Sequence, residues 1–218
     1  MLFRSVEVRV ITTGDPSIRE YAGILTDRIP IHRYRMNLAS AVIEEGARWA
    51  DLIQTFNYHA CRPSMLAGAR TGRPVVCGFL GLFGDAWLDI KGRALGRMFR
   101  AWERRLLGLP FDRLCFLSEF SKRQAVELGS SAARSRVVCP GIQIERFTPS
   151  PRKEPLVLFV GKFSRRKGVY EVLEAARALP EYRFRMIGWG PEEKALRKSA
   201  PPNLHVQRGE AGRPPLAD

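Results

Sequence analysis

The sequence predicts an α/β protein built on parallel β-sheets. Short apolar runs recur along the 218 residues, and stretches with helical spacing separate them. Several of these runs end at a glycine, directly before a stretch with helical spacing. Such alternation forms parallel sheets in which the turns after the strands gather at one edge.

The first 150 residues are predicted to form one domain of this kind. Strands are expected at residues 6–12, 29–36, 50–56, 74–79, 112–117 and 136–139. Helices are expected between them, at about residues 37–48, 59–69, 90–107 and 118–128. A polar link that contains prolines, at residues 149–154, is expected to separate this domain from a second one at residues 151–218.

The second domain is predicted to repeat a simple unit of strand, glycine turn and helix. Residues 156–160 form an uncharged apolar run that suits a buried strand, and residues 168–179 have helical spacing. A second strand is expected at residues 183–187. Pro191 suits the first position of the helix that follows, with two glutamates in its first turn.

The two glycine turns of the second domain predict an anion site. Two helix N-termini would face one crevice with unpaired backbone N–H groups. The first turn adds four cations, Lys162, Arg165, Arg166 and Lys167. Glycines allow the backbone to approach phosphate oxygens, and fixed cations neutralise charge on a leaving diphosphate. The alternative is a pair of ordinary helix starts with solvated charges, and glycine turns alone do not decide between the two.

Composition restricts the partners and the compartment. The net charge is +14, from 36 basic and 22 acidic residues, which favours anionic partners: nucleotide sugars, acidic lipid surfaces or nucleic acid. The four cysteines and three histidines have no metal-ligand or redox spacing, and Cys77 and Cys115 are expected to be reduced core residues. No secretory signal or membrane-length apolar run is visible, so a cytoplasmic protein is expected.

Two ordered motifs resemble the donor half of the retaining glycosyltransferases of family 4, which have the GT-B fold. The family pattern Gly-Arg-x-x-x-x-Lys-Gly is matched by Gly161, Lys162, Lys167 and Gly168, with Lys162 at the usual arginine. The family pattern Gly-x-Gly-Pro is matched by Gly188, Gly190 and Pro191. Residues 137–149 are similar to the family hinge, with Gln143 at the usual aspartate, and the first domain resembles the acceptor-binding domain of these enzymes.

The resemblance implies a fold and an activity. The fold would be GT-B-like, with two Rossmann-type parallel-sheet domains. The activity would be transfer of a hexose-type sugar from a nucleotide-diphosphate sugar to a glycan or lipid-linked acceptor, with retention and without a metal or other cofactor. Such reactions serve cell-envelope or glycoconjugate biosynthesis. The implied donor-binding residues are Gly161, Lys162, Arg166, Lys167, Gly188, Gly190 and Pro191.

The acceptor side departs from the family pattern. Leu80 stands where the family often has a histidine that helps to place the donor, and a leucine cannot form a hydrogen bond. His59 and Asp85 are the candidates that could reach the same crevice. The alternatives are an exposed residue at a helix start for His59 and a turn or capping role for Asp85. The sequence assigns no catalytic residue, sugar, base or acceptor.

A basic helix is expected within the first domain. Residues 91–105 contain six basic side chains and one acid, Glu103. One face carries Leu95, Met98, Phe99, Trp102 and Leu106. This face would pack on the sheet and leave the arginines in water, or the helix would lie on the anionic inner face of a membrane.

Two other classes of function stay open, together with an expectation about completeness. A nucleic-acid-binding protein would use the +14 charge, although the basic residues are dispersed and no recognition motif is visible. A glycosyltransferase-like protein that binds a nucleotide sugar without catalysis would explain Leu80. Against the family pattern, a first strand and the carboxyl-terminal half of the donor domain are missing, so these 218 residues alone are expected to be inactive.

Overall fold

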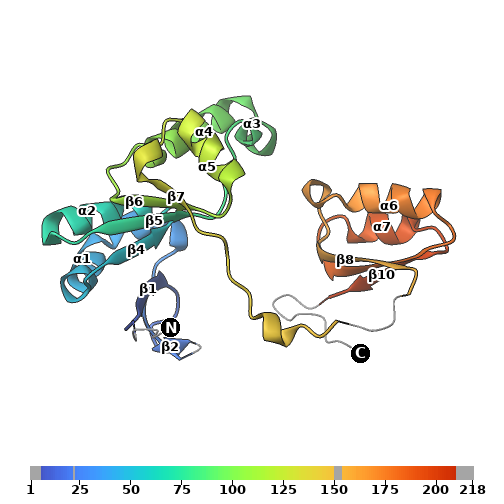
Figure 1. The fold of residues 1–218 in the computed structure, drawn as a ribbon, viewed down its shortest axis with the longest axis horizontal. Coiled ribbons are helices and arrows are strands. Elements are labelled where there is room, and N and C mark those ends of the chain that lie inside the picture. Colours follow the sequence, from blue (N-terminus) through green and yellow to red (C-terminus); the bar gives the residue numbers. More distant parts are fainter. Residues whose placement is uncertain (1–5, 22, 150–153, 210–218) are drawn as a thin grey trace. The chain divides into compact units, whose positions relative to one another are not determined.

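The computed structural model describes residues 6–21, 23–149 and 154–209 (Figure 1). The link at residues 150–153 and the closing run at residues 210–218 lie outside the described residues. The chain divides into two compact units, Met1–Ile142 and Gln143–Asp218. The division falls upstream of the expected boundary, inside the segment that is similar to the family hinge.

The main sheet of the first unit has four parallel strands. They are β4 (Ile53–Phe56), β5 (Val75–Phe79), β6 (Arg113–Phe116) and β7 (Ser135–Val137), and they lie side by side in chain order. Helix α2 (Cys61–Thr71) connects β4 to β5, and α5 (Glu119–Glu127) with the 3-10 turn η2 (Ala132–Arg134) connects β6 to β7. The parallel α/β sheet predicted for this region is therefore confirmed.

A smaller sheet precedes it in the chain. Its strands are β1 (Arg9–Thr13), β2 (Glu20–Tyr21) and β3 (Ile24–Ile29); β3 pairs with β1 in parallel and with β2 in antiparallel. The strand predicted at residues 29–36 is wrong. Pro30 has no N–H group to extend the ladder, so β3 ends at Ile29 and a 3-10 helix, η1 (Arg33–Leu38), follows it. Helix α1 (Ser40–Trp49) then begins after Ala39, not at Asn37.

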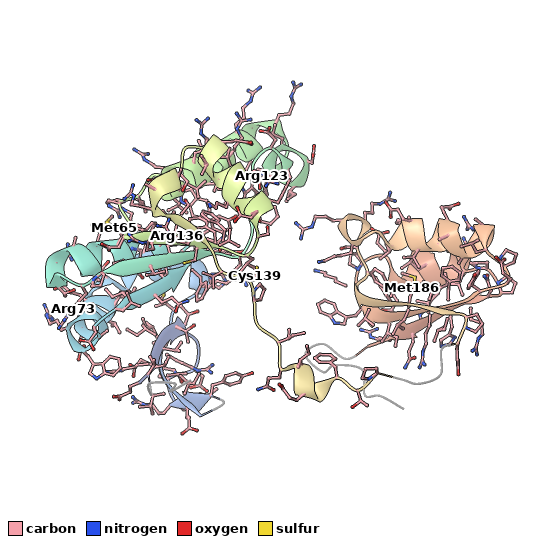
Figure 2. All side chains as sticks on the ribbon, in the orientation of Figure 1. Met65, Arg73, Arg123, Arg136, Cys139 and Met186 are labelled. Carbon is pink, nitrogen blue, oxygen red and sulfur yellow. The ribbon has the colours of Figure 1, made fainter. Side chains whose placement is uncertain are left out.

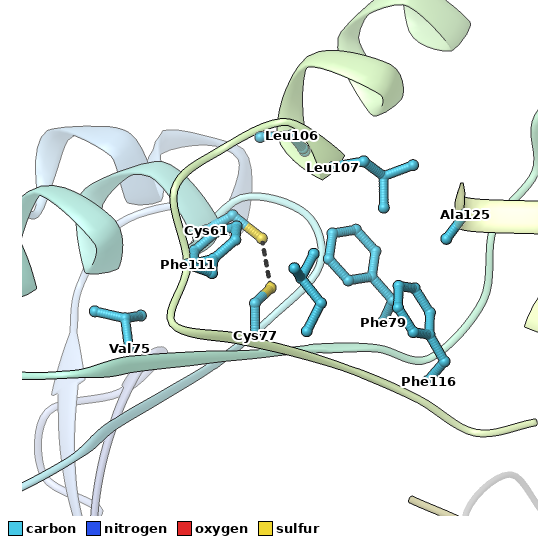
Figure 3. Close-up of a cluster of buried hydrophobic side chains, with 10 residues drawn as sticks. Cys61, Val75, Cys77, Phe79, Leu106, Leu107, Phe111, Phe116 and Ala125 are labelled. Atoms are coloured by element: carbon cyan, nitrogen blue, oxygen red, sulfur yellow. Dashed lines mark hydrogen bonds between the residues drawn. The ribbon is translucent and has the colours of Figure 1, made fainter. Parts of the chain in front are cut away.

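Aromatic side chains fill the core of the first unit (Figure 3). Phe79, Phe111 and Phe116 are fully buried between the main sheet and its helices. Cys61 and Cys77 meet in this core with their sulfur atoms 3.4 Å apart, although all four cysteines are free. The two cysteines are 16 residues apart, so their spacing in the sequence does not indicate a pair. They meet because α2 packs beside β5. The hydrogen bond with Cys61, together with burial, raises the pKa of the Cys77 thiol.

The basic segment forms two helices where one was predicted. They are α3 (Ala86–Lys91) and α4 (Arg93–Leu107), separated at Gly92, whose φ of 76° lies in the left-handed region that favours glycine. The predicted apolar face is only partly buried. Leu106 lies in the core, whereas Leu95 and Met98 are 44% and 59% exposed. Within the described residues no helix has both the length and the apolar character to cross a membrane.

The second unit has a three-stranded parallel sheet in the order β10-β9-β8. Its strands are β8 (Leu156–Lys162), β9 (Arg183–Trp189) and β10 (Leu204–Arg208). Helices α6 (Val169–Ala178) and α7 (Glu193–Ser199) lie on one side of this sheet (Figure 1). Met186 of β9 is fully buried between the sheet and the helices (Figure 2). The 3-10 turns η3 (Ile144–Arg146) and η4 (Arg165–Lys167) complete the unit.

Strand β8 is less buried than its apolar sequence predicts. Leu156, Val157, Leu158 and Val160 are 40–55% exposed. The strand lies at the edge of the described sheet. Helices α6 and α7 cover only one face of this sheet, so side chains on its other face are exposed. The buried strand predicted at residues 156–160 is therefore an exposed edge strand in the described part of the chain.

Replacement of Gly96 by alanine should destabilise the first unit. A Cβ at Gly96 would lie 2.5 Å from the carbonyl oxygen of Trp87, where α4 crosses α3. A Gly→Ala replacement within a helix normally increases the free energy of unfolding. Here the overlap should instead lower it by about 1–3 kcal/mol. Urea unfolding measures the change. Gly108→Ala is the matched control because its Cβ would meet its nearest atoms at an ordinary 3.7 Å. Equal stability of the two variants would contradict the tight crossing.

Candidate functional site

The two glycine turns of the second unit lie side by side. The backbone N–H of Phe163 donates to the carbonyl oxygen of Trp189 at 2.7 Å, and the N–H of Glu192 donates to the carbonyl oxygen of Phe163 at 3.2 Å. Phe163 directly follows Lys162, which forms the last pair of β8 and β9 with Trp189. The structure therefore brings the predicted residues of both motifs to one edge of the sheet, at the carboxyl ends of its strands.

Two of the motif glycines are required by this close approach. A Cβ at Gly188 would lie 1.8 Å from the carbonyl oxygen of Gly161. Gly190 has φ +155°, and its Cβ would lie 2.3 Å from the carbonyl oxygen of Phe163. Gly161 is different, because its Cβ would meet only the ring of Phe159, at 3.5 Å. Close packing thus requires glycine at positions 188 and 190. It does not require glycine at position 161.

Helix α6 begins where the sequence predicts it, whereas the helix after the second glycine turn begins later than predicted. Gly168 precedes α6 with φ +74°, as a glycine at this junction allows. Helix α7 begins at Glu193, with Glu192 at the capping position, so Pro191 lies outside the helix that it was predicted to open. This second helix has seven residues, so its dipole contributes less than that of α6.

The cations of the first turn are not equivalent. Arg165 lies 3.7 Å from the Glu192 carboxylate and 4.8 Å from the centre of the Tyr170 ring. The Tyr170 hydroxyl donates to Glu192, and this hydrogen bond raises the pKa of Tyr170. Lys162 lies 5.5 Å from the centre of the Trp189 ring.

Arg166 and Lys167 follow as exposed residues of the same turn. Within the described part of the chain, neither Lys162 nor Lys167 has a carboxylate partner. Sequence reasoning assigned Glu192 only to a helix start. It missed the ion pair that this carboxylate forms with Arg165.

The acceptor-side candidates His59 and Asp85 lie in different surroundings. The His59 ring is half-buried between the rings of Tyr34 and Trp102, at centroid distances of 4.8 and 5.6 Å. Burial, and then the positive charge of Arg33, lowers the pKa of His59, which favours the neutral form of its imidazole.

Asp85 is exposed and forms an ion pair with Arg100. It lies at the start of α3 but makes no side-chain capping bond there. Among the described residues the structure shows no contact between Asp85 and His59. It therefore does not bring the two acceptor-side candidates together.

A buried carboxylate that the sequence did not single out lies beside these residues. Glu103 of α4 is fully buried and accepts hydrogen bonds from the Tyr58 hydroxyl and from the backbone of the loop after β5. Burial, and then the bond to Glu103, raises the pKa of Tyr58. The lone acid among six basic residues was the available signal in the sequence.

A small pocket of about 150 Å³ is lined in part by Tyr58, the hydrogen-bond partner of Glu103. Its lining residues are Asn37, Tyr58, Arg62, Trp102, Arg105, Leu106 and Leu109. The pocket combines aromatic rings with guanidinium groups from α2 and α4. In the described part of the chain no three histidine, cysteine or acidic side chains gather as metal ligands.

Comparison with protein families gives two matches that together cover most of the chain. Residues 4–141 match the family described as "Glycosyl transferase 4-like domain". Residues 142–202 match "Glycosyl transferases group 1". The junction of the two matches coincides with the division between the two compact units.

Curated relatives align with part of the chain. A D-inositol 3-phosphate glycosyltransferase of Mycobacterium sp. (strain KMS) is 34% identical over 113 residues, which is 46% of this chain and 25% of that protein. The putative colanic acid biosynthesis glycosyltransferase WcaL of Escherichia coli (strain K12) is 29% identical over 94 residues, which is 39% of this chain and 23% of WcaL. The chain thus aligns with about a quarter of the length of these relatives.

A solved structure supports the same fold. HepE from Anabaena, crystallised with UDP, superposes with a TM-score of 0.68 at 16% identity, over 92% of this chain and 61% of HepE. At this identity the likeness concerns the fold. It confirms the predicted class: α/β and GT-B-like, with Rossmann-type parallel sheets in both units.

Alanine at Gly188 and at Gly161 should separate a packing glycine from a ligand glycine. Gly188→Ala forces a Cβ against a backbone carbonyl and should lower the free energy of unfolding by about 2 kcal/mol or more. Gly161→Ala meets only a side-chain ring and should leave stability within about 1 kcal/mol of wild type. Thermal unfolding measures both. A Gly188→Ala variant as stable as Gly161→Ala would show that the two turns are not in this contact.

Proposed function

This chain belongs to the glycosyl transferase 4-like family, and from that premise we propose that it moves a sugar from a nucleotide-diphosphate sugar to a hydroxyl-bearing acceptor. The sugar is of the hexose type, the anomeric configuration is retained, and no metal takes part. The acceptor is a glycan or a lipid-linked glycan of cell-envelope or glycoconjugate biosynthesis, reached from the cytoplasmic side of the membrane. The chain aligns with a quarter of its curated relatives, so the activity is proposed for the full-length protein.

The observation that carries this proposal is the shared edge of the two glycine turns. It combines a sheet edge where α/β proteins bind ligands with the N-terminus of the ten-residue helix α6. It also holds two lysines that have no carboxylate partner among the described residues. Gly161 adds a backbone position that packing does not require to be glycine. These features suit a diphosphate, which carries negative charge and many acceptor oxygens. The UDP bound in the HepE crystal supports the same ligand class.

The chemistry follows from where negative charge develops. The oxygen of the acceptor hydroxyl forms the new bond to the anomeric carbon, and its proton passes to the released nucleoside diphosphate. As the bond between the sugar and the diphosphate breaks, its electron pair moves to the leaving phosphate oxygen. Lys162 and Lys167 would stabilise this developing charge, and the α6 dipole would add to their effect. Arg165 is held by Glu192, and we assign it to positioning the turn. Arg166, Gly188, Gly190 and Pro191 complete the proposed donor site.

The first unit is proposed as the acceptor side, with His59 and Asp85 as its candidate residues. Leu80 supports a second possibility, a protein that binds the nucleotide sugar without transferring it. Calorimetry with UDP, GDP and their sugars, followed by a transfer assay, separates these cases. Binding of one nucleotide without turnover supports the non-catalytic protein, whereas salt-sensitive binding to oligonucleotides would favour a nucleic-acid-binding protein.

Replacement of both Lys162 and Lys167 by alanine in the full-length protein should nearly abolish transfer. Loss of fixed positive charge at the leaving group should lower kcat by about 100-fold or more and weaken nucleotide binding by about tenfold. Initial-rate kinetics and calorimetry with UDP measure the two effects. Lys194→Ala with Lys198→Ala, on the exposed surface of α7, is the matched control. Wild-type turnover in the Lys162/Lys167 variant would refute the donor site.

Peripheral binding to anionic membranes is predicted for the basic segment at residues 91–105. Leu95 and Met98 are exposed next to Arg93 and Arg97, so apolar and cationic groups share one surface. Co-sedimentation with vesicles that contain anionic lipid, at low salt, should show weak binding. Changing Arg93 and Arg97 to glutamate should reduce it at least about tenfold. Arg100 is left unchanged because Asp85 already pairs with it.

The matched control for the vesicle assay is Arg113→Glu with Arg136→Glu, which changes the net charge equally on exposed residues outside the helix. Equal loss of binding in both double variants would assign the effect to net charge and remove the helix from the prediction.

A further inference from the structure

A fully buried carboxylate needs strong compensation. Moving a carboxylate out of water is costly unless donors replace its hydration. Glu103 is 0% exposed, and three donors surround it. The Tyr58 hydroxyl donates to Oε1 at 2.6 Å, the N–H of Phe83 to Oε1 at 3.1 Å, and the N–H of Gly84 to Oε2 at 2.7 Å.

All three donors come from the loops that follow β4 and β5. Asn57 joins the same two loops directly: its Nδ2 donates to the carbonyl oxygen of Gly81 at 3.0 Å, and its Oδ1 accepts from the N–H of Leu80 at 3.1 Å. Side chains from β4's end and from α4 therefore hold the backbone at four positions of the loop at residues 80–84. This loop lies at the carboxyl edge of the sheet, where α/β proteins bind ligands.

Packing of the core alone does not require a carboxylate at this position. An apolar side chain of similar size would fill the core without the cost of desolvating a charge. An apolar side chain could not accept hydrogen bonds from the backbone N–H groups of Phe83 and Gly84. The distinctive effect of Glu103 is thus to fix the conformation of the loop. Because Leu80 is 59% exposed, this loop presents its surface to solvent.

We propose that Glu103 is a positioning residue of the acceptor side: it holds residues 80–84 in one conformation, so that the surface at the ends of β4 and β5 is preformed for the hydroxyl-bearing acceptor. This inference rests on the proposed transferase function. Glu103 itself contacts no substrate, because the loop and Tyr58 cover it.

Glu103→Gln tests the loop directly, without any substrate. An amide of the same size has one acceptor oxygen and one NH₂ group, so it cannot accept on both sides, and the N–H of Phe83 or Gly84 loses its partner. Amide hydrogen exchange at residues 80–84 should accelerate about tenfold or more. Exchange in the second unit should stay at its wild-type rate.

Two further variants serve as controls. Tyr58→Phe removes the third donor to Glu103 and the 3.3 Å bond from the Tyr58 hydroxyl to the carbonyl oxygen of Gly81, but it leaves both backbone bonds to Glu103. Exchange at Phe83 and Gly84 should therefore change less than in Glu103→Gln. Glu119→Gln changes an exposed glutamate and should have no effect on the loop. Unchanged exchange at Phe83 and Gly84 in Glu103→Gln would overturn the inference.

Steady-state kinetics then separates positioning from general damage. Well below the melting temperature, Glu103→Gln should raise the KM for the acceptor about tenfold and change the KM for the nucleotide sugar much less. A merely structural defect lowers the active fraction, which reduces kcat and leaves both KM values in place. That result, with faster loop exchange, would also overturn the positioning role.

Failure of the proposed function is distinguishable from failure of this inference. A wild-type protein that neither binds UDP nor transfers sugar would refute the donor site of the second unit. The exchange measurement would still decide whether Glu103 fixes the loop of the first unit.

Discussion

In the second unit, the backbone of Phe163 donates a hydrogen bond to Trp189, the last residue of β9, and accepts one from Glu192 in the turn that follows. These bonds continue the contact between β8 and β9 past their last paired residues. Everything proposed for the donor site depends on this approach, because it sets the spacing between the first turn and the second. It also determines the residue type at Gly188 and Gly190, where a Cβ would overlap a carbonyl oxygen.

The first unit fixes its sheet edge by a different physical means. Its loops are held by side chains, Asn57 and Glu103, that bond to backbone groups across the edge. At the closest points of the backbone approach in the second unit, Gly188 and Gly190, a Cβ does not fit and the residue must be glycine. Side-chain contacts constrain the sequence to particular polar residues and leave the loop residues themselves more variable. The presence of Leu80 where the family often has histidine is compatible with this second arrangement, since only the N–H of Leu80 is held.

Local patterns were sufficient for much of the fold. The helical spacing at residues 168–179 predicted α6 nearly to the residue, and the glycine turns predicted which strands share an edge. Sequence-based predictions failed where the structure depends on single breaking residues or on contacts between residues far apart in the sequence. Residues 29–36 alternate like a strand, yet Pro30 ends the ladder. Glu103 meets donors 19 to 45 residues away, which no spacing rule connects. The same holds for the Glu192–Arg165 ion pair, which joins residues 27 positions apart and lowers the net positive charge of the proposed donor site.

The charge of the chain and the charge of the proposed site act at different ranges. A net charge of +14 spread over both units attracts any anion and raises the rate of encounter, an effect that salt screens. It cannot select a diphosphate. Selection requires fixed groups with a defined spacing, and Glu192 contributes to this by holding Arg165 against the Tyr170 ring. The ion pair thus takes Arg165 out of the set of cations proposed for the diphosphate, which leaves Lys162, Arg166 and Lys167.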